Sequence, residues 1–163
     1  MSFELKGLGK LDDKGRMDEL INYIKIQVED EDDPIALMSN ISSFIMAIIR
    51  DLNWSGFYIV GYDNLILGPF QGLPACTRLN FDSGVCAKAY RDKKITNIKD
   101  VNKFDGHVVC DNNSASELVV PIFNDGNVVA VIDMDSPSFA RFTEIEEKGF
   151  EEISHILKDK IKI

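Results

Sequence analysis

Three cysteines, Cys76, Cys86 and Cys110, lie in the middle third of this 163-residue chain, each in a stretch rich in turn residues. The first residues lack a basic segment followed by an apolar one, so we expect no signal peptide and a cytoplasmic location. Thiols stay reduced in that compartment, and an odd number of them fits a disulfide framework poorly. The clustered cysteines therefore favour redox or metal chemistry.

Three carboxylates form a second candidate group. Asp133 and Asp135 are two residues apart in a predicted strand, so their side chains point to the same face, and Glu117 stands near the start of the strand expected to pair with it. Like charges raise one another's pKa, so at least one of these acids should hold a proton near neutral pH and serve as a general acid. Alternatively, Asp133 and Asp135 end the strand and cap the turn at Ser136 and Pro137.

Two other roles are open to the cysteines. They could be inert core thiols, although a polar loop around Cys110 disfavours this. They could also bind zinc together with His107, but the chain has no Cys-x-x-Cys pair, so we expect no metal.

The carboxylates expected near these cysteines disfavour a low-pKa thiolate. A thiol beside an acid suits an electrophile that is protonated before attack, and a sulfoxide is one.

The elements that must position these residues follow from hydrophobic periodicity. We expect an N-terminal arm over 1–14, helices over 15–28, 34–51 and 84–91, and a final helix opened by a capping box at Thr143 and Glu146. We expect strands over 53–60, 65–70, 76–79, 94–98, 117–123 and 128–135, and a polar loop over 99–114. This order predicts an α+β fold, a mostly antiparallel sheet with the N- and C-terminal helices on one face and the ligand site on the other.

Composition bounds the function. An apolar fraction of 45% with 28% charged residues is typical of one globular domain. A net charge of −9 argues against nucleic acid and anionic membranes as partners, and no apolar run approaches the roughly 20 residues that span a bilayer.

Six ordered blocks resemble the free methionine-(R)-sulfoxide reductases, which are GAF-domain enzymes. The blocks are residues 53–58 (NWSGFY), 67–78 (LGPFQGLPACTR), 84–86 (GVC), 105–111 (DGHVVCD), 116–121 (SELVVP) and 132–136 (IDMDS). They include all three cysteines. The resemblance implies a single GAF-like domain over 15–163, after the arm.

The resemblance also implies a thiol-dependent reduction of free L-methionine-(R)-sulfoxide. Cys110 would attack the sulfoxide sulfur, leaving a cysteine sulfenic acid that Cys76 resolves as a disulfide, with Cys86 as an alternative or additional resolving thiol. No cofactor is expected, because thioredoxin or an equivalent dithiol would supply the electrons.

In the same way, the resemblance implies roles for the remaining site residues. Glu117 would hold or protonate the sulfoxide oxygen, and Asp133 and Asp135 would share that proton or bind the substrate's ammonium group. Trp54 and Tyr58, which share a strand face, would wall the pocket for the methyl group, unless both are simply core aromatics.

Two competing functions are a GAF module that senses a small molecule without catalysis and a cysteine redox sensor. A sensor has no need of three thiols, and we expect no output domain in 163 residues. The sequence leaves open whether the protein forms a homodimer.

Overall fold

Six strands form one antiparallel sheet at the centre of the fold. The structure, a computed structural model, describes residues 5, 7–106, 108 and 112–162. Within these residues the strands are β1 (Trp54–Val60), β2 (Asn64–Gly72), β3 (Arg78–Asn80), β4 (Thr96–Ile98), β5 (Ser116–Asn124) and β6 (Asn127–Ser136). Their spatial order is β3-β2-β1-β6-β5-β4. The last strand, β6, therefore runs through the middle of the sheet, between β1 and β5.

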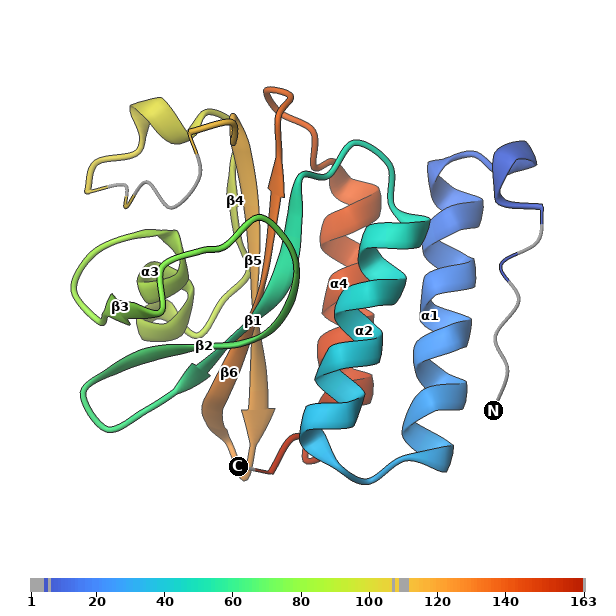
Figure 1. Cartoon of the computed structure of the whole chain (residues 1–163), viewed down its shortest axis with the longest axis horizontal. Helices are drawn as coiled ribbons and strands as arrows, with labels where there is room; N and C mark the ends of the chain where they lie inside the picture. Colours follow the sequence, from blue (N-terminus) through green and yellow to red (C-terminus); the bar gives the residue numbers. More distant parts are fainter. Residues whose placement is uncertain (1–4, 6, 107, 109–111, 163) are drawn as a thin grey trace.

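Helices divide between the two faces of this sheet, as Figure 1 shows. On one face α2 (Pro34–Ile48) and α4 (Glu144–Leu157) contact the strands, and α1 (Asp13–Asp30) packs on both helices from outside. On the other face lie α3 (Val85–Asp92), the short 3-10 helix η2 (Val101–Lys103) and the connecting loops. The predicted α+β arrangement, with terminal helices on one face, is confirmed. Among the described residues, no helix is long and apolar enough to cross a membrane.

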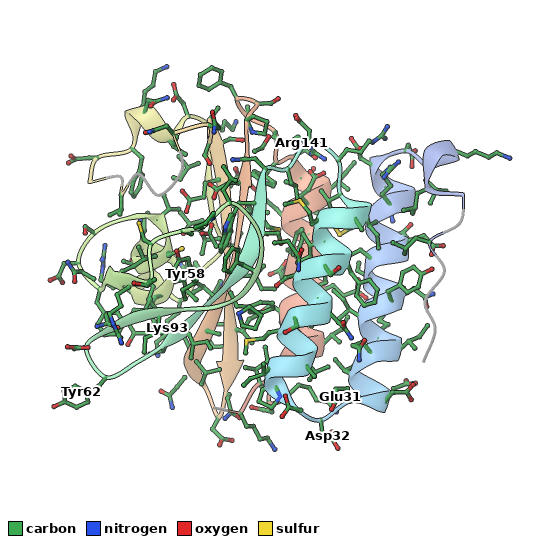
Figure 2. The ribbon with its side chains drawn as sticks, in the orientation of Figure 1. Glu31, Asp32, Tyr58, Tyr62, Lys93 and Arg141 are labelled. Carbon is green, nitrogen blue, oxygen red and sulfur yellow. The ribbon has the colours of Figure 1, made fainter. Side chains whose placement is uncertain are left out.

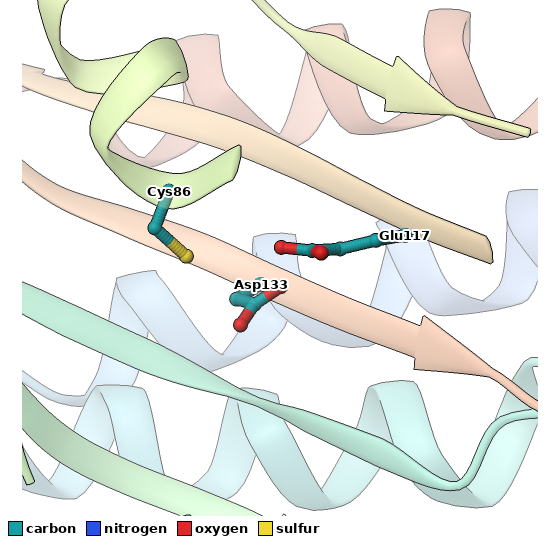
Figure 3. A group of neighbouring side chains, drawn as sticks. All are labelled: Cys86, Glu117 and Asp133. Carbon is teal, nitrogen blue, oxygen red and sulfur yellow. The ribbon is translucent and has the colours of Figure 1, made fainter. Parts of the chain in front are cut away.

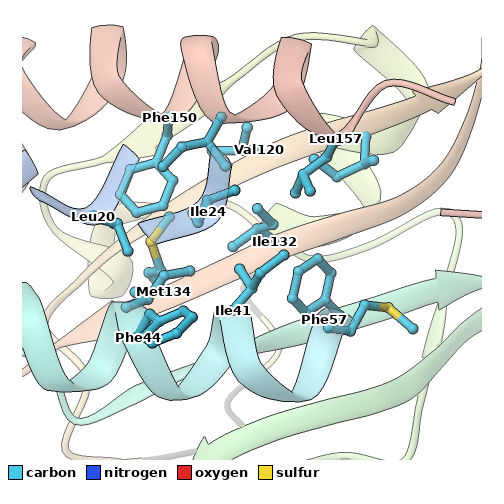
Figure 4. Packing of buried hydrophobic residues seen from close by; sticks show 14 of the residues in the cluster. Leu20, Ile24, Ile41, Phe44, Phe57, Val120, Ile132, Met134, Phe150 and Leu157 are labelled. Atoms are coloured by element: carbon cyan, nitrogen blue, oxygen red, sulfur yellow. The ribbon is translucent and has the colours of Figure 1, made fainter. Parts of the chain in front are cut away.

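Side chains alternate between two hydrophobic clusters because successive residues of a strand point to opposite faces. Phe57, Ile132 and Met134 pack with the helices in the larger cluster, which Figure 4 shows from close by. Trp54 and Tyr58, from the same strand as Phe57, belong to the smaller cluster on the α3 face. The division of β1 and β6 into these two faces is as predicted.

Local signals explain where several elements begin and turn. The Asp33 side chain accepts hydrogen bonds from the first backbone amides of α2, and Pro34 stands in its first turn. The predicted capping box at Thr143 and Glu146 opens α4. Asp125 and Gly126, with φ of 48° and 77°, make the tight turn that joins β5 to β6. This hairpin fixes the register on which the candidate site depends.

The boundaries of some predicted elements were wrong. Helix α1 begins at Asp13, inside the segment predicted as an arm, because Asp12 caps it by accepting from the Gly15 amide. The arm also contains a 3-10 helix, η1 (Leu8–Lys10), and Arg16 Nη2 donates to the Leu8 carbonyl at 2.7 Å. The second helix ends at Ile48 rather than 51, and the strand predicted over 76–79 is β3 at Arg78–Asn80.

Candidate active site

The three carboxylates lie together on the α3 face of the sheet. Asp133 and Asp135 are on β6 and share a face because they are two residues apart. Glu117, on β5, is the direct cross-strand partner of Asp135, and the Asp133 and Glu117 side chains are hydrogen-bonded to each other. Asp133 and Glu117 are each only 7% exposed. The predicted acid cluster therefore exists and is buried.

A cysteine thiol lies next to the two buried acids. Cys86 stands in the first turn of α3, which packs over β5 and β6. Its Sγ and one carboxylate oxygen each from Glu117 and Asp133 all lie within 4.8 Å of one another. Figure 3 shows the three side chains converging from these elements. The Cys86 thiol is also hydrogen-bonded to Asp133.

Burial raises the pKa of all three groups, and nearby negative charges add to this effect for Glu117 and Cys86. Burial is the main cause that raises the pKa of Asp133 from 3.8 to about 6. Burial first, and then the nearby Asp133 and Asp135 charges, raise the pKa of Glu117 well above its usual value. The same causes, burial foremost, raise the pKa of the Cys86 thiol. The raised pKa of Glu117 favours its protonated form, which is the form that a general acid requires.

A small cavity opens beside these groups. Its volume is about 30 Å³, room for one or two waters, whereas ligand pockets typically measure about 300 Å³ or more. The described residues that line it are Tyr58, Leu79, Gly84, Val85, Cys86, Val108, Ser114, Glu117, Asp133 and Asp135. A whole amino acid therefore does not fit unless the pocket widens.

The other two cysteines, Cys76 and Cys110, are not part of this group of side chains as the structure describes it. Cys76 is disulfide-bonded, whereas Cys86 is a free, buried thiol and so is not its partner. The Tyr58 hydroxyl donates to the Cys76 carbonyl at 2.9 Å, which ties the Cys76 segment to the site strand. Cys110, the predicted nucleophile, and His107 lie outside the described residues.

The two predicted aromatic walls are adjacent. Figure 2 labels Tyr58, on the side of the sheet away from α1 and α2; it lines the cavity. Trp54 is not among the described lining residues, but it stacks on Tyr58 and Phe70 with ring centroids 6.0 and 5.4 Å apart. Its Nε1 donates to the Leu73 carbonyl at 3.1 Å. Trp54 thus supports the pocket wall from behind Tyr58.

Comparisons with known proteins show which family this chain resembles. Residues 38–160 match the GAF domain family model. The free methionine-R-sulfoxide reductase of Escherichia coli (strain K12) is 40% identical over 119 residues, which cover 73% of this chain and 72% of the relative.

A structure of the Neisseria meningitidis free methionine-R-sulfoxide reductase, in complex with its substrate, superposes with a TM-score of 0.91. It is 33% identical, and the match covers 98% of this chain and 95% of that one. This chain belongs to the GAF-domain family of free methionine-(R)-sulfoxide reductases. Protein YtsP of Bacillus subtilis (strain 168) is also similar, 45% identical over 141 residues, or 85% of this chain and 86% of the relative.

In this reductase-family chain, sequence reasoning missed several pocket residues. Gly84, Val108 and Ser114 line the cavity. The first two belong to the motif blocks but were given no role, and Ser114 was not singled out. Gly84 has a φ of 90°, a conformation that favours glycine, and its place directly before α3 was the signal for it. Ser114 accepts a hydrogen bond from Asn53 Nδ2 at 3.1 Å. The two residues are far apart in sequence, so no local sequence pattern predicts this contact.

Proposed function

We propose that this chain reduces free methionine-(R)-sulfoxide to methionine. The observation that carries the proposal is the buried, hydrogen-bonded pair of Glu117 and Asp133 at a cavity on the α3 face. A sulfoxide oxygen is a poor leaving group until it is protonated, and an acid with a raised pKa keeps its proton for this step at neutral pH. The relatives named above as reductases of this substrate support the same activity.

The proposed first step transfers oxygen from sulfur to sulfur. The Cys110 thiol attacks the sulfoxide sulfur while Glu117 protonates the oxygen. A bond forms between the two sulfur atoms, and the oxygen then passes to the Cys110 sulfur. The sulfur–sulfur bond and the substrate's sulfur–oxygen bond both break, so that methionine leaves and Cys110 is left as a sulfenic acid. The substrate is reduced by two electrons and Cys110 is oxidised by two. Asp133 shares the proton with Glu117, and Asp135 binds the substrate's ammonium group.

The proposed second step restores the thiols. Cys76 attacks the sulfenic sulfur, a Cys76–Cys110 disulfide forms, and the oxygen leaves as water. Thioredoxin or an equivalent dithiol then reduces that disulfide and is itself oxidised. The disulfide-bonded state of Cys76 supports its resolving role. Cys86 is a weaker candidate for this role, because burial and the raised pKa keep its thiol protonated and therefore poorly nucleophilic.

The test is a single-turnover assay with each diastereomer of free methionine sulfoxide. Reduced protein without a recycling dithiol should release at most one methionine per chain from the (R) form, and mass spectrometry should then find a Cys76–Cys110 disulfide. Oxidation by peroxide together with no release from either diastereomer would instead identify a redox sensor. Binding without release would identify a sensing module.

Cysteine variants assign the thiols. Cys110→Ser should abolish even the first turnover, while Cys76→Ser should keep it and lose cycling with thioredoxin. Cys86→Ser is the matched control, because it removes a thiol from the same pocket and should keep thioredoxin-driven cycling. Full cycling by Cys76→Ser, with none by Cys86→Ser, would move the resolving role to Cys86.

A further inference from the structure

The donor atoms of Cys86, Glu117 and Asp133 lie slightly farther apart than the ligands of a bound metal ion would. One sulfur and two carboxylate oxygens lie within 4.8 Å of one another. Tetrahedral zinc, with bonds of about 2.3 Å to sulfur and about 2.1 Å to oxygen, needs its ligands about 3.4–3.6 Å apart. A contraction of about 1 Å, within the reach of side-chain rotation, would close the three atoms around one ion.

A second observation points to a missing ligand at Asp133. Its side chain is 7% exposed, and its Oδ1 is buried without a hydrogen-bond partner among the described residues. A buried acceptor left without a partner costs about 1–3 kcal/mol, so native sites usually supply one. Asp133 also lines the cavity, where a water has room to serve as a fourth ligand. An ion bound there would satisfy the atom that the protein leaves unsatisfied.

We propose that Cys86, Glu117 and Asp133 bind one zinc ion, with water in the fourth position. The mixed set of one thiolate and two carboxylates suits zinc, whereas magnesium and calcium take oxygen ligands alone. This site differs from the zinc site weighed from the sequence, which used Cys76; that sulfur is disulfide-bonded.

Zinc at this position would regulate the site. It would occupy the Glu117 carboxylate and so block the group that the proposed function assigns to the sulfoxide oxygen. This consequence for activity rests on the proposed function, whereas the binding itself does not. We therefore expect zinc to inhibit the reductase reversibly.

Equilibrium dialysis against Zn²⁺, with bound metal measured by atomic emission, tests the site. The protein is used with Cys76 disulfide-bonded, as in the structure, so that this sulfur cannot contribute. Wild type should bind one zinc per chain. Since loss of a group that merely orients a ligand weakens metal binding about 10- to 100-fold, loss of a ligand in Cys86→Ala should weaken it about 100-fold or more. Asp32→Asn, in the exposed acidic loop between α1 and α2 (Figure 2), is the control and should bind as wild type does.

Cobalt supplies a readout that needs no variant. Co²⁺ bound to wild type should give thiolate-to-cobalt charge-transfer absorption, and Zn²⁺ should displace it. Absence of stoichiometric zinc, absence of the thiolate band, or an unchanged affinity in folded Cys86→Ala would each overturn the site. With reduced protein, zinc should suppress methionine release and a chelator should restore it. If zinc binds through Cys86 but metal-free protein releases no methionine, the proposed function fails and the zinc site stands.

Discussion

Replacing Asp133 by asparagine should stabilise the protein at high pH and not at low pH. The folded protein keeps Asp133 in a buried position that raises its pKa from 3.8 to about 6, whereas the unfolded chain returns it to its ordinary value. At a pH between these two pKa values, Asp133 holds a proton in the folded protein that it has lost in the unfolded chain. The free energy of unfolding therefore falls as pH rises from about 4 through 6, and the loss is complete above pH 7. Asparagine has no proton to lose and escapes this penalty.

The magnitude follows from the two pKa values. Their difference, from 3.8 to about 6, at about 1.36 kcal/mol for each pH unit, gives about 3 kcal/mol. The stability of Asp133→Asn relative to wild type should thus increase by about 3 kcal/mol between pH 4 and pH 8. Removing the Asp133 charge also eases ionisation of Glu117, whose pKa that charge raises, and this acts in the same direction.

Urea unfolding at a series of pH values measures the effect. Trp54, the single tryptophan and a buried neighbour of the site, reports unfolding by its fluorescence. Both proteins are kept in one thiol redox state with a chelator present. Asp32→Asn removes the same charge from an exposed loop and should track wild type at every pH. A stability difference between Asp133→Asn and wild type that stays constant from pH 4 to pH 8 would refute the reasoning.

Three further predictions concern catalysis and packing. Glu117→Gln should slow single-turnover sulfoxide cleavage by about 10²-fold or more, as loss of a general acid does elsewhere; stopped assays of methionine release check this, and an unchanged rate clears Glu117 of the role. The wild-type rate of that step should fall as pH rises through the raised pKa of Glu117, since only the protonated acid can donate; a rate that keeps climbing at alkaline pH would contradict it. Gly149→Ala places a methyl group against Met17 where α1 meets α4, so urea unfolding should find a loss of about 1–3 kcal/mol with methionine release unchanged, and no loss would mean that this contact can relax.

The sequence by itself determined which face of each strand carries the chemistry. Alternation placed Asp133 and Asp135 on one side of β6 and Met134 on the other, because strand geometry repeats every two residues whatever surrounds it. The turn at Asp125 and Gly126 could also be predicted from the sequence, since few residue types adopt its backbone conformation. The α+β class followed from the order of such local elements, and the resemblance of the ordered motif blocks implied the GAF architecture.

Only the tertiary structure decided which groups meet. The packing of α3 across β5 and β6 brings Cys86 to Glu117 and Asp133, and nothing in the local sequence around Cys86 specifies those partners. The same packing buries all three groups, and burial is the main cause of their raised pKa values. Orientation within a strand is a local property of the backbone, whereas proximity and desolvation depend on how distant segments pack together.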